Sequence, residues 1–159
     1  MNRRKKGRPQ QADAELTKAL IVQAARKLLR HQKPARITRE AVARAAKVDP
    51  GLVRYYFGNT NSLFAHVIRK IGDDLHARLD ALPAAASALD GLRDQARVWV
   101  QVFLDDPHFH DLVVDRVFHG EDRTALEILD RFVERAYPRI ERLVSGGTRR
   151  GELRKADPR

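Results

Sequence analysis

Apolar side chains recur at helical spacing along most of this chain, and no segment alternates with the two-residue period of a β-strand. The first segment, at about residues 13–31, repeats an apolar side chain every four residues, at Leu16, Leu20, Ala24 and Leu28. Pro34 ends this helix, because proline lacks the N–H that a helix interior donates. The pattern therefore predicts an all-α protein that begins with an amphipathic helix.

Two short helices are predicted next, at about residues 39–46 and from Pro50 to Gly58. Thr38 and Asp49 precede them, and both residue types cap helix N-termini through a side-chain oxygen. Proline is well placed at a first helical position, where its missing N–H has no cost. Four core positions are expected to pack these helices on each other and on the first helix: Ala43, Val48, Val53 and Phe57.

A long helix follows at residues 61–82, with Thr60 or Asn61 as its cap and an apolar residue nearly every fourth position. Ser87 opens another helix that ends near residue 105. Its predicted buried face is Leu89, Leu92, Ala96, Trp99 and Phe103. Asp106 and Pro107 cap the next helix.

The last helix is predicted at about residues 122–145. Its buried stripe is expected to be Leu126, Leu129, Phe132, Val133, Ala136, Ile140 and Leu143. Pro138 lies inside this pattern and predicts a kink near residues 134–138. Gly146 and Gly147 are expected to end the helix, because glycine weakens a helix interior.

The charge of the chain is concentrated in its N-terminal third. The net charge is +10. Residues 1–60 contain 15 Lys and Arg against 4 Asp and Glu, whereas residues 61–159 contain 16 against 17. This asymmetry favours a polyanionic partner for the N-terminal third, with double-stranded DNA as the leading candidate. The alternative is a solvated basic tail that binds nothing.

Composition excludes several other classes of protein. The chain has no cysteine, which rules out disulfides, thiolate chemistry and zinc fingers and fits a cytoplasmic location. It has no apolar run of membrane-spanning length and no secretory signal, so no membrane partner is expected. No nucleophile triad, phosphate loop or carboxylate pair stands out, so we expect neither an enzyme nor a cofactor.

The second short helix carries residue types that suit a DNA surface. The predicted core leaves four neighbouring residues more exposed: Leu52, Arg54, Tyr55 and Tyr56. A helix that faces only solvent rarely exposes two tyrosines, an arginine and a leucine together. Tyrosine hydroxyls and a guanidinium donate to phosphate oxygens, while a leucine and a tyrosine ring pack on thymine methyl groups. Gly51 lets the backbone approach base edges. We therefore predict a helix-turn-helix that places this helix in the major groove.

Residues 37–64, ITREAVARAAKVDPGLVRYYFGNTNSLF, resemble the helix-turn-helix of the TetR family of bacterial transcriptional repressors. The family's motif reads T-x-x-x-I-A-x-x-A-G-V-S-x-G-x-L-Y-x-Y-F-x-x-K-x-x-L. Ten positions match it or substitute conservatively: Thr38, Val42, Ala43, Ala46, Val48, Gly51, Val53, Tyr56, Phe57 and Leu63. The resemblance covers about residues 16–68 and is only architectural beyond them.

Three positions depart from the family's motif. Lys47 replaces the turn glycine, so either a lysine adopts a positive φ or the turn shifts. Arg54 stands where the family has tyrosine, and Thr60 replaces a phosphate-binding lysine. The candidate DNA-binding residues are Arg4, Lys6, Arg8, Thr38, Arg39, Lys47, Pro50, Gly51, Leu52, Arg54, Tyr55, Tyr56, Thr60 and Asn61.

The basic arm contains Lys6-Gly7-Arg8-Pro9, which resembles the core of a minor-groove AT-hook. The alternative is a disordered tail that follows phosphates without reading the groove. Either interpretation assists DNA binding. Because Thr60 removes one cation, we expect binding to depend strongly on this arm.

The resemblance also implies a ligand pocket in the C-terminal helices. The candidate effector-binding residues are Arg97, Trp99, Gln101, Phe103, Arg116, Phe118, His119, Phe132 and Tyr137. The alternative for the aromatic ones is an ordinary core, since apolar stripes need no ligand. His108 and His110 lie among acids, but residues two apart do not face each other on a helix, so no metal site is expected.

The sequence thus predicts a basic disordered arm (1–12), a helix-turn-helix domain (13–60) and a helical ligand-binding and dimerisation domain (61–159), with helix 61–82 joining the two. By resemblance the protein is a ligand-responsive repressor that binds a pseudo-palindromic operator as a homodimer. The chain stops about where the family's last two helices begin. Truncation, dimerisation through the remaining helices and a monomer all stay open.

Two other functions remain as alternatives to a regulator. One is a helical module that sequesters a ligand or binds a protein and has lost sequence-specific DNA reading, which Lys47 and Thr60 would explain. The other is a basic architectural protein that binds any duplex equally. Selection from random DNA discriminates all three.

Overall fold

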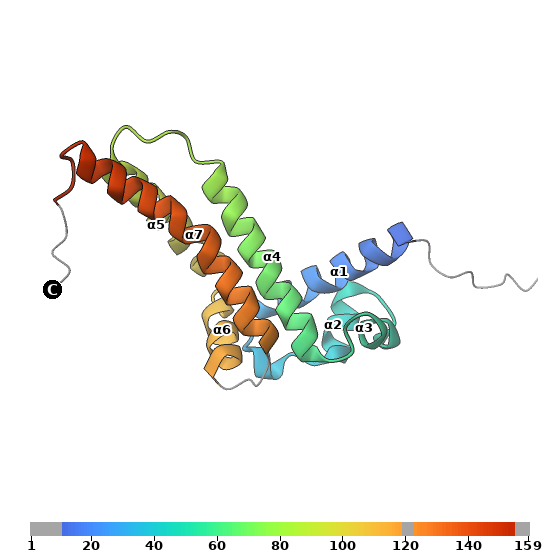
Figure 1. Cartoon of the computed structure of the whole chain (residues 1–159). Helices are drawn as coiled ribbons and strands as arrows, with labels where there is room; N and C mark the ends of the chain where they lie inside the picture. The colour runs from blue at the N-terminus through green and yellow to red at the C-terminus, as the bar shows by residue number, and fades with distance from the viewer. Residues whose placement is uncertain (1–10, 119–122, 155–159) are drawn as a thin grey trace, which may run out of the picture. The chain divides into compact units, whose positions relative to one another are not determined.

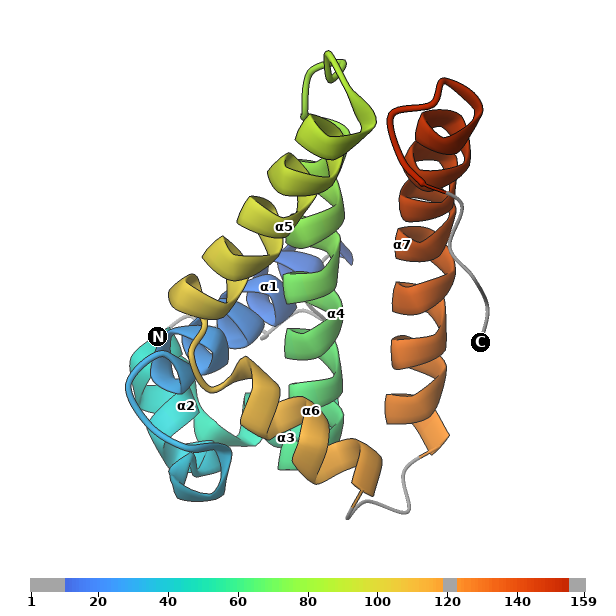
Figure 2. The same cartoon turned by 90° about the vertical axis from the view of Figure 1, so that its left-hand side faces the viewer.

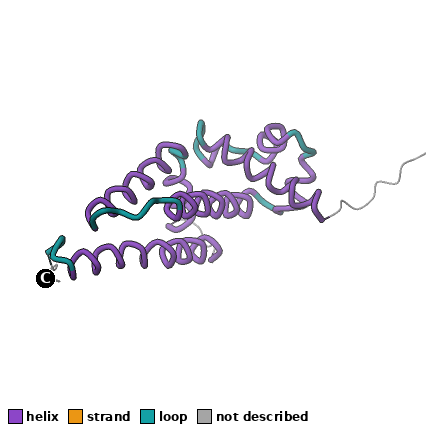
Figure 3. The backbone as a smooth tube through the Cα atoms, turned by 90° about the horizontal axis from the view of Figure 1, so that it is seen from above, coloured by secondary structure: helices purple, strands orange, loops and turns teal. Residues whose placement is uncertain are grey.

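The computed structural model describes residues 11–118 and 123–154, without the side chains of 11, of 115–118 and of most residues in 123–132. All regular structure in these ranges is helical, which confirms the all-α class (Figures 1 and 3). The helices are α1 (Gln11–Leu29), α2 (Arg39–Ala46), α3 (Pro50–Phe57), α4 (Thr60–Asp80), α5 (Ala88–Asp105), α6 (Phe109–Phe118) and α7 (Arg123–Arg149). None of them, as far as described, combines the length and the apolar character needed to cross a membrane.

The chain divides into two compact units, and the division falls within α4. The N-terminal unit is Met1–Val67 and the C-terminal unit is Ile68–Arg159. The N-terminal unit contains α1, α2, α3 and the first part of α4. The second part of α4 belongs to the C-terminal unit with α5, α6 and α7, so each unit has its own set of packed helices.

The core of the N-terminal unit is built from the predicted short-helix positions and a shifted face of α1. Ala43, Val53 and Phe57 are buried as predicted. On α1, however, Leu16 and Leu20 are 64 % and 52 % exposed, and the buried residues are Ile21, Ala24, Ala25 and Leu29. A repeat of four residues drifts by about 40° per step around a helix of 3.6 residues per turn. The predicted stripe therefore leaves the buried face toward the start of α1.

Side-chain caps begin the short helices as the sequence predicts. Thr38 Oγ1 accepts from the Ala41 N–H at 3.2 Å, and Asp49 Oδ1 accepts from the Gly51 N–H at 2.7 Å. The cap of α4 differs from the prediction of Thr60 or Asn61: Asn59 Oδ1 accepts from the Ser62 N–H at 2.8 Å, and α4 itself begins at Thr60. The neighbouring Gly58, with φ +70°, ends α3.

Ion pairs connect α4 to both α5 and α7 within the C-terminal unit. Arg78 lies 2.7 Å from Asp105 on α5, Arg135 lies 3.7 Å from Asp73, and Arg139 pairs with Asp80. The apolar stripe of α4 faces the same interior, where Ile71, Leu75 and Leu79 are buried. Figure 2 shows α5 and α7 beside this part of α4. Buried leucines and peripheral ion pairs together hold the three helices.

The predicted buried face of α5 is wrong. Leu89 and Phe103 are exposed, and the residues buried instead are Ala88, Gly91, Gln95 and Val102. These are smaller or more polar, but they allow α7 to come close: a Cβ on Gly91 would lie 2.7 Å from Leu143 Cδ2. Ala88 likewise faces Gly147. Residue numbers rise along one helix as they fall along the other, so α5 and α7 are antiparallel.

The end of α7 also differs from the prediction. The helix continues past Gly146 and Gly147 to Arg149, and Pro138 lies inside it. Gly151, two residues past the end of the helix, has a φ of +74°. The Glu152 N–H donates to the Gly147 carbonyl at 2.9 Å, and the Gly151 N–H donates to Thr148 at 3.2 Å. These two bonds form a Schellman motif, which satisfies the last carbonyls of the helix.

Candidate nucleic-acid interface

The turn between α2 and α3 keeps its shape although a lysine replaces glycine. Lys47 has φ 57° and ψ 40°, the left-handed conformation. Its N–H donates to the carbonyls of Ala43 and Arg44, and the Val48 N–H donates to Ala43 at 3.0 Å. Of the two outcomes open from the sequence, the structure therefore shows the positive φ. A side chain in this conformation costs about 1 kcal/mol, and the bonds to α2 offset that cost.

Packing fixes which side of α3 faces outward. Val53 and Phe57 are buried, and the Phe57 ring meets His66 of α4 edge-on with centroids 5.1 Å apart. The opposite side presents Arg54 and Tyr55, of which Tyr55 is 75 % exposed. Leu52 and Tyr56 are half-buried beside them. The helix thus presents aromatic and cationic groups on a rigidly held surface.

The start of α3 is shaped by a close contact between Asp49 and Gly51. A Cβ on Gly51 would lie 2.8 Å from Asp49 Oδ1, so any larger residue displaces the cap. The sequence suggested that Gly51 lets the backbone approach DNA bases. In the structure, the absence of a Cβ also leaves room for the Asp49 carboxylate that accepts the Gly51 N–H, and the approach to DNA stays a prediction. Pro50 occupies the first helical position beside it and is exposed.

A cation from α1 joins the aromatic pair on α3, which the sequence did not indicate. The rings of Tyr55 and Tyr56 meet edge to face with centroids 5.0 Å apart. The Lys18 ammonium lies 5.8 Å from the centroid of the Tyr56 ring, within cation–π range. Glu15, 2.8 Å from this ammonium, raises the pKa of Lys18 by hydrogen bonding and charge. Only the packing of α1 on the other helices brings Lys18 here.

The remaining candidate DNA-binding residues occupy the edges of this surface. Thr38 is exposed at the start of α2, and Arg39 is half-buried with its Nε 3.5 Å from Glu40 Oε1. Thr60 is the first residue of α4 and is half-buried, while Asn61 beside it is exposed. Arg4, Lys6 and Arg8 lie outside the described residues.

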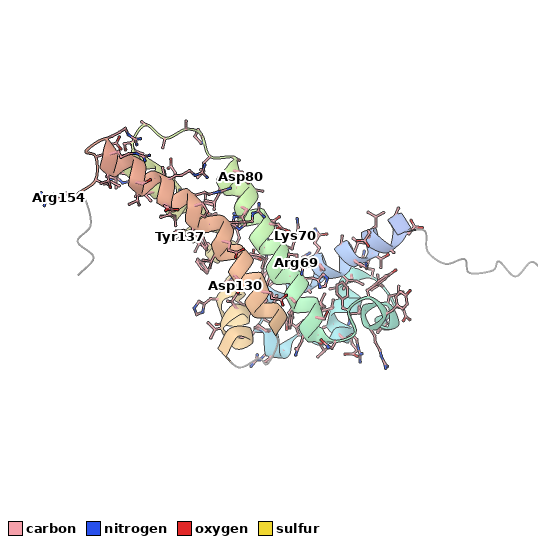
Figure 4. All side chains as sticks on the ribbon, in the orientation of Figure 1. Arg69, Lys70, Asp80, Asp130, Tyr137 and Arg154 are labelled. Atoms are coloured by element: carbon pink, nitrogen blue, oxygen red, sulfur yellow. The ribbon has the colours of Figure 1, made fainter. Side chains whose placement is uncertain are left out.

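The described effector candidates do not converge on one enclosed site. Arg97 and Gln101 are exposed on α5, bonded to Asp94 and Asp105 at 2.9 Å each. Phe103 and Tyr137 are 41 % and 63 % exposed, and Trp99 is half-buried. Figure 4 labels Tyr137 on α7. The side chains of Arg116, Phe118, His119 and Phe132 lie outside the described residues.

The acidic and histidine segment before α6 has a local structural role. His108 Nδ1 lies 3.0 Å from Asp111 Oδ2, one turn further along. The Phe109 N–H donates to the Asp106 carbonyl at 2.9 Å. In the described parts of the chain, no three His, Asp or Glu side chains gather as metal ligands would.

The N-terminal unit has the features of a helix-turn-helix protein of the DNA-binding regulator class. These features are two short helices, a tight turn with a left-handed residue between them, and an exposed helix face with aromatic and cationic side chains. The sequence profile of the bacterial regulatory proteins of the tetR family matches residues 21–67. Residues 21–67 therefore match this family, and the resemblance predicted from residues 37–64 is confirmed.

Solved structures show that the fold extends over most of the chain. A tetR-family transcriptional regulator from Streptomyces coelicolor has a TM-score of 0.69 at 19 % identity, covering 91 % of this chain and 61 % of its own. The HlyIIR mutant protein has a TM-score of 0.66 at 19 % identity, with 91 % and 77 % covered. NalD of Pseudomonas aeruginosa, the secondary repressor of the MexAB-OprM efflux pump, has a TM-score of 0.56 at 26 % identity, with 91 % and 76 % covered. No curated protein sequence matches significantly.

Proposed function

We propose that this chain is a cytoplasmic transcriptional repressor that binds a pseudo-palindromic operator as a homodimer and responds to a small-molecule effector. The observation that carries the proposal is the outward face of α3. Val53 and Phe57 anchor this helix, while Arg54 and Tyr55 project from it. A rigid helix with donors and an aromatic ring is suited to the major groove. NalD, a similar protein, is described as a repressor, which supports the sign of regulation.

The DNA-reading part of this proposal is tested by selection from random duplex DNA with the full chain. We expect an enriched, approximately palindromic motif. Replacing Tyr55 and Tyr56 with alanine should abolish binding to that motif, since both hydroxyls and rings leave the reading surface. Lys70→Ala, which removes an exposed cation of α4 paired with Asp74, is the matched control and should bind as the parent does.

Two results would contradict the proposal. If no motif is enriched while binding to every duplex is equal, the protein is an architectural binder. If it binds no duplex, the sequestration module is favoured. Undiminished affinity after both tyrosine substitutions would show that another surface reads the DNA.

The homodimer is proposed from an apolar face that α5 and α7 share. We call this the α5/α7 face; it comprises Leu89, Ala96, Val100 and Phe103 on α5 and Val133, Tyr137, Ile140 and Val144 on α7, all exposed. Monomeric proteins seldom expose a contiguous apolar surface of this kind without a partner.

Helix geometry places both halves of this face on one side of the pair. Leu89 directly follows buried Ala88, and Phe103 follows buried Val102. On α7, Tyr137 follows buried Ala136 in the same way. Each step of one residue turns by about 100°, and antiparallel helices turn in opposite senses when viewed from one end. The two stripes therefore point to the same side.

Spacing along α7 favours a second helix as the covering partner. Residues 133, 137, 140 and 144 are separated by four, three and four positions, as in the seam between paired helices. A second copy of this chain supplies an identical face, and a two-fold axis pairs such faces with each other. Dimerisation also doubles the half-sites that the protein contacts.

A further inference from the structure

The C-terminal unit contains a cavity of about 390 Å³ that lies outside the residues expected to bind an effector. The end of α4, the connection to α5 and the facing sides of α5 and α7 form its walls. Its apolar lining includes Leu79, Leu82 and Leu143, and its polar lining includes Gln95, Arg139 and Arg142. This size lies within the range of small-molecule sites.

The charged groups around the cavity are not balanced. Asp80 is paired with Arg139, and Asp94 is paired with Arg97 at 2.9 Å. Arg150 is likewise paired, with its Nε 2.5 Å from Glu152 Oε1. The lining carboxylates are thus already occupied by arginines, and what remains is positive charge.

Two guanidinium groups on α7 keep donors available toward the cavity. Arg142 donates its Nε to the Pro138 carbonyl at 3.1 Å and has no carboxylate partner among the described residues. The Nη1 of Arg139 is buried and has no hydrogen-bond acceptor in the described part of the chain. A buried guanidinium N–H without an acceptor is unfavourable. An oxyanion fits both arginines, because the planar guanidinium matches carboxylate, phosphate and sulfonate oxygens.

A neighbouring histidine is subject to the same positive field. His76, one turn before Asp80 on α4, is buried. Burial lowers the pKa of His76 most, and the charges of Arg135 and Arg139 lower it further, against the opposing effect of Asp80 and Asp73. The positive charge of the α7 arginines therefore reaches the interior of the C-terminal unit.

We propose that this cavity binds an organic anion, with its charged group on Arg139 and Arg142 and its apolar body against Leu79, Leu82 and Leu143. This names the effector class of the proposed regulator and so rests on that function, although binding itself requires no DNA. An anion at Arg139 shares the guanidinium that pairs with Asp80, which Figure 4 labels on α4. Binding therefore alters the ion pair that connects α7 to α4. Helix α4 also continues into the N-terminal unit.

The test uses 8-anilinonaphthalene-1-sulfonate as the anionic probe and N-phenyl-1-naphthylamine, the same skeleton without the sulfonate, as its neutral counterpart. Binding of both is titrated by fluorescence to the full chain and to Arg142→Gln, Arg139→Gln and Arg149→Gln. Arg149 is an exposed arginine of α7 outside the cavity lining and serves as the matched control. Arg142→Gln leaves the pair between Arg139 and Asp80 in place, so it tests the site even if Arg139→Gln fails to fold.

We expect the sulfonate to bind the parent with one site per chain and to weaken about tenfold in Arg142→Gln, while Arg149→Gln changes it less than about twofold. The neutral probe should bind parent and variants alike. Three results would overturn the proposal. The first is an equal affinity of the sulfonate for the parent and Arg142→Gln, and the second is an equal loss of affinity for both probes in that variant. The third is no binding of the sulfonate to the parent. The DNA selection tests the proposed function separately. If a motif is enriched but the sulfonate does not bind, the inference about the cavity is wrong and the proposed DNA-binding function stands.

Discussion

Gly147 of α7 lies so close to Ala88 of α5 that a Cβ at position 147 would be 2.4 Å from the Ala88 Cβ. Its neighbour Gly146 differs, because a Cβ there would meet only Arg150 Nη1, at 3.3 Å. A flexible guanidinium moves aside easily, whereas two packed helices do not. The contact between the helices therefore requires glycine at position 147, whereas position 146 has room for a larger residue.

We predict that Gly147→Ala destabilises the C-terminal unit by about 1–3 kcal/mol, the usual cost of overpacking a close contact. Gly146→Ala is the matched control and should be neutral or stabilising by up to about 1 kcal/mol, because alanine favours the helix. Urea denaturation of both variants measures the difference. Equal effects of the two substitutions would show that α5 and α7 do not approach as closely as described.

Lys47→Gly is predicted to stabilise the N-terminal unit by about 0.5–1 kcal/mol. The gain arises because glycine adopts φ 57° without a Cβ clash, and it is reduced by the greater freedom of glycine in the unfolded chain. Arg44→Gly, an exposed position inside α2, should instead destabilise by about 1 kcal/mol. Thermal denaturation compares them, and a destabilised Lys47→Gly would contradict the left-handed turn.

Deletion of residues 1–9, which contain five Lys and Arg, is predicted to weaken binding to all duplexes. It should also flatten the salt dependence, because each lost phosphate contact removes about 0.9 from the slope of log affinity against log salt. Replacing those five residues with glutamine at constant length separates charge from chain length. An unchanged slope in either protein would mean that the arm does not touch DNA.

Glu152→Gln is predicted to lower the Tm at neutral pH and to have less effect in acid. The bond from Arg150, followed by the Ala88 N–H at 2.6 Å, lowers the pKa of Glu152 from its ordinary 4.5. A lowered folded-state pKa stabilises the protein above the unfolded value and loses that contribution as pH falls through the folded value. Melting curves between pH 7 and pH 3 measure this. A gap between parent and variant that stays constant over that range would contradict the role of the carboxylate.

Val100→Lys combined with Tyr137→Lys is predicted to give a monomer, because two cations then lie in the centre of the α5/α7 face, where the parent residues are 57 % and 63 % exposed. The variant should bind an operator at least tenfold more weakly, since it contacts one half-site at a time. Gln101→Lys, on another side of α5, is the control. Sedimentation velocity reports the mass, and a dimeric double variant would show that another surface joins the copies.

The features that the sequence predicted well are those set by near neighbours. Thr38 and Asp49 each cap a helix through a backbone N–H two or three residues away, and such contacts depend on residue type and spacing alone. The match of Val53 and Phe57 to the buried side of α3 follows from helical periodicity in the same way.

The features that it missed depend on contacts between distant segments. Hydrophobicity favoured Leu89 and Phe103 as the buried side of α5, but close approach of α7 selected Ala88 and Gly91. Gly147 was expected to break α7, yet the same contact holds it within the helix. The cavity beside Arg139 is formed by side chains from three helices, so no local sequence pattern predicts it.

Residues 150–154 look like a tail that can be removed when the chain is shortened for crystallisation. The carboxylate of Glu152 nevertheless reaches back 64 positions to the first N–H of α5, and Leu153 packs on Gly147. A boundary drawn after Arg149 would remove both contacts, leaving the first N–H of α5 without its carboxylate and the last turn of α7 without its closing bonds. The shortest version of this protein worth expressing therefore extends at least through Leu153.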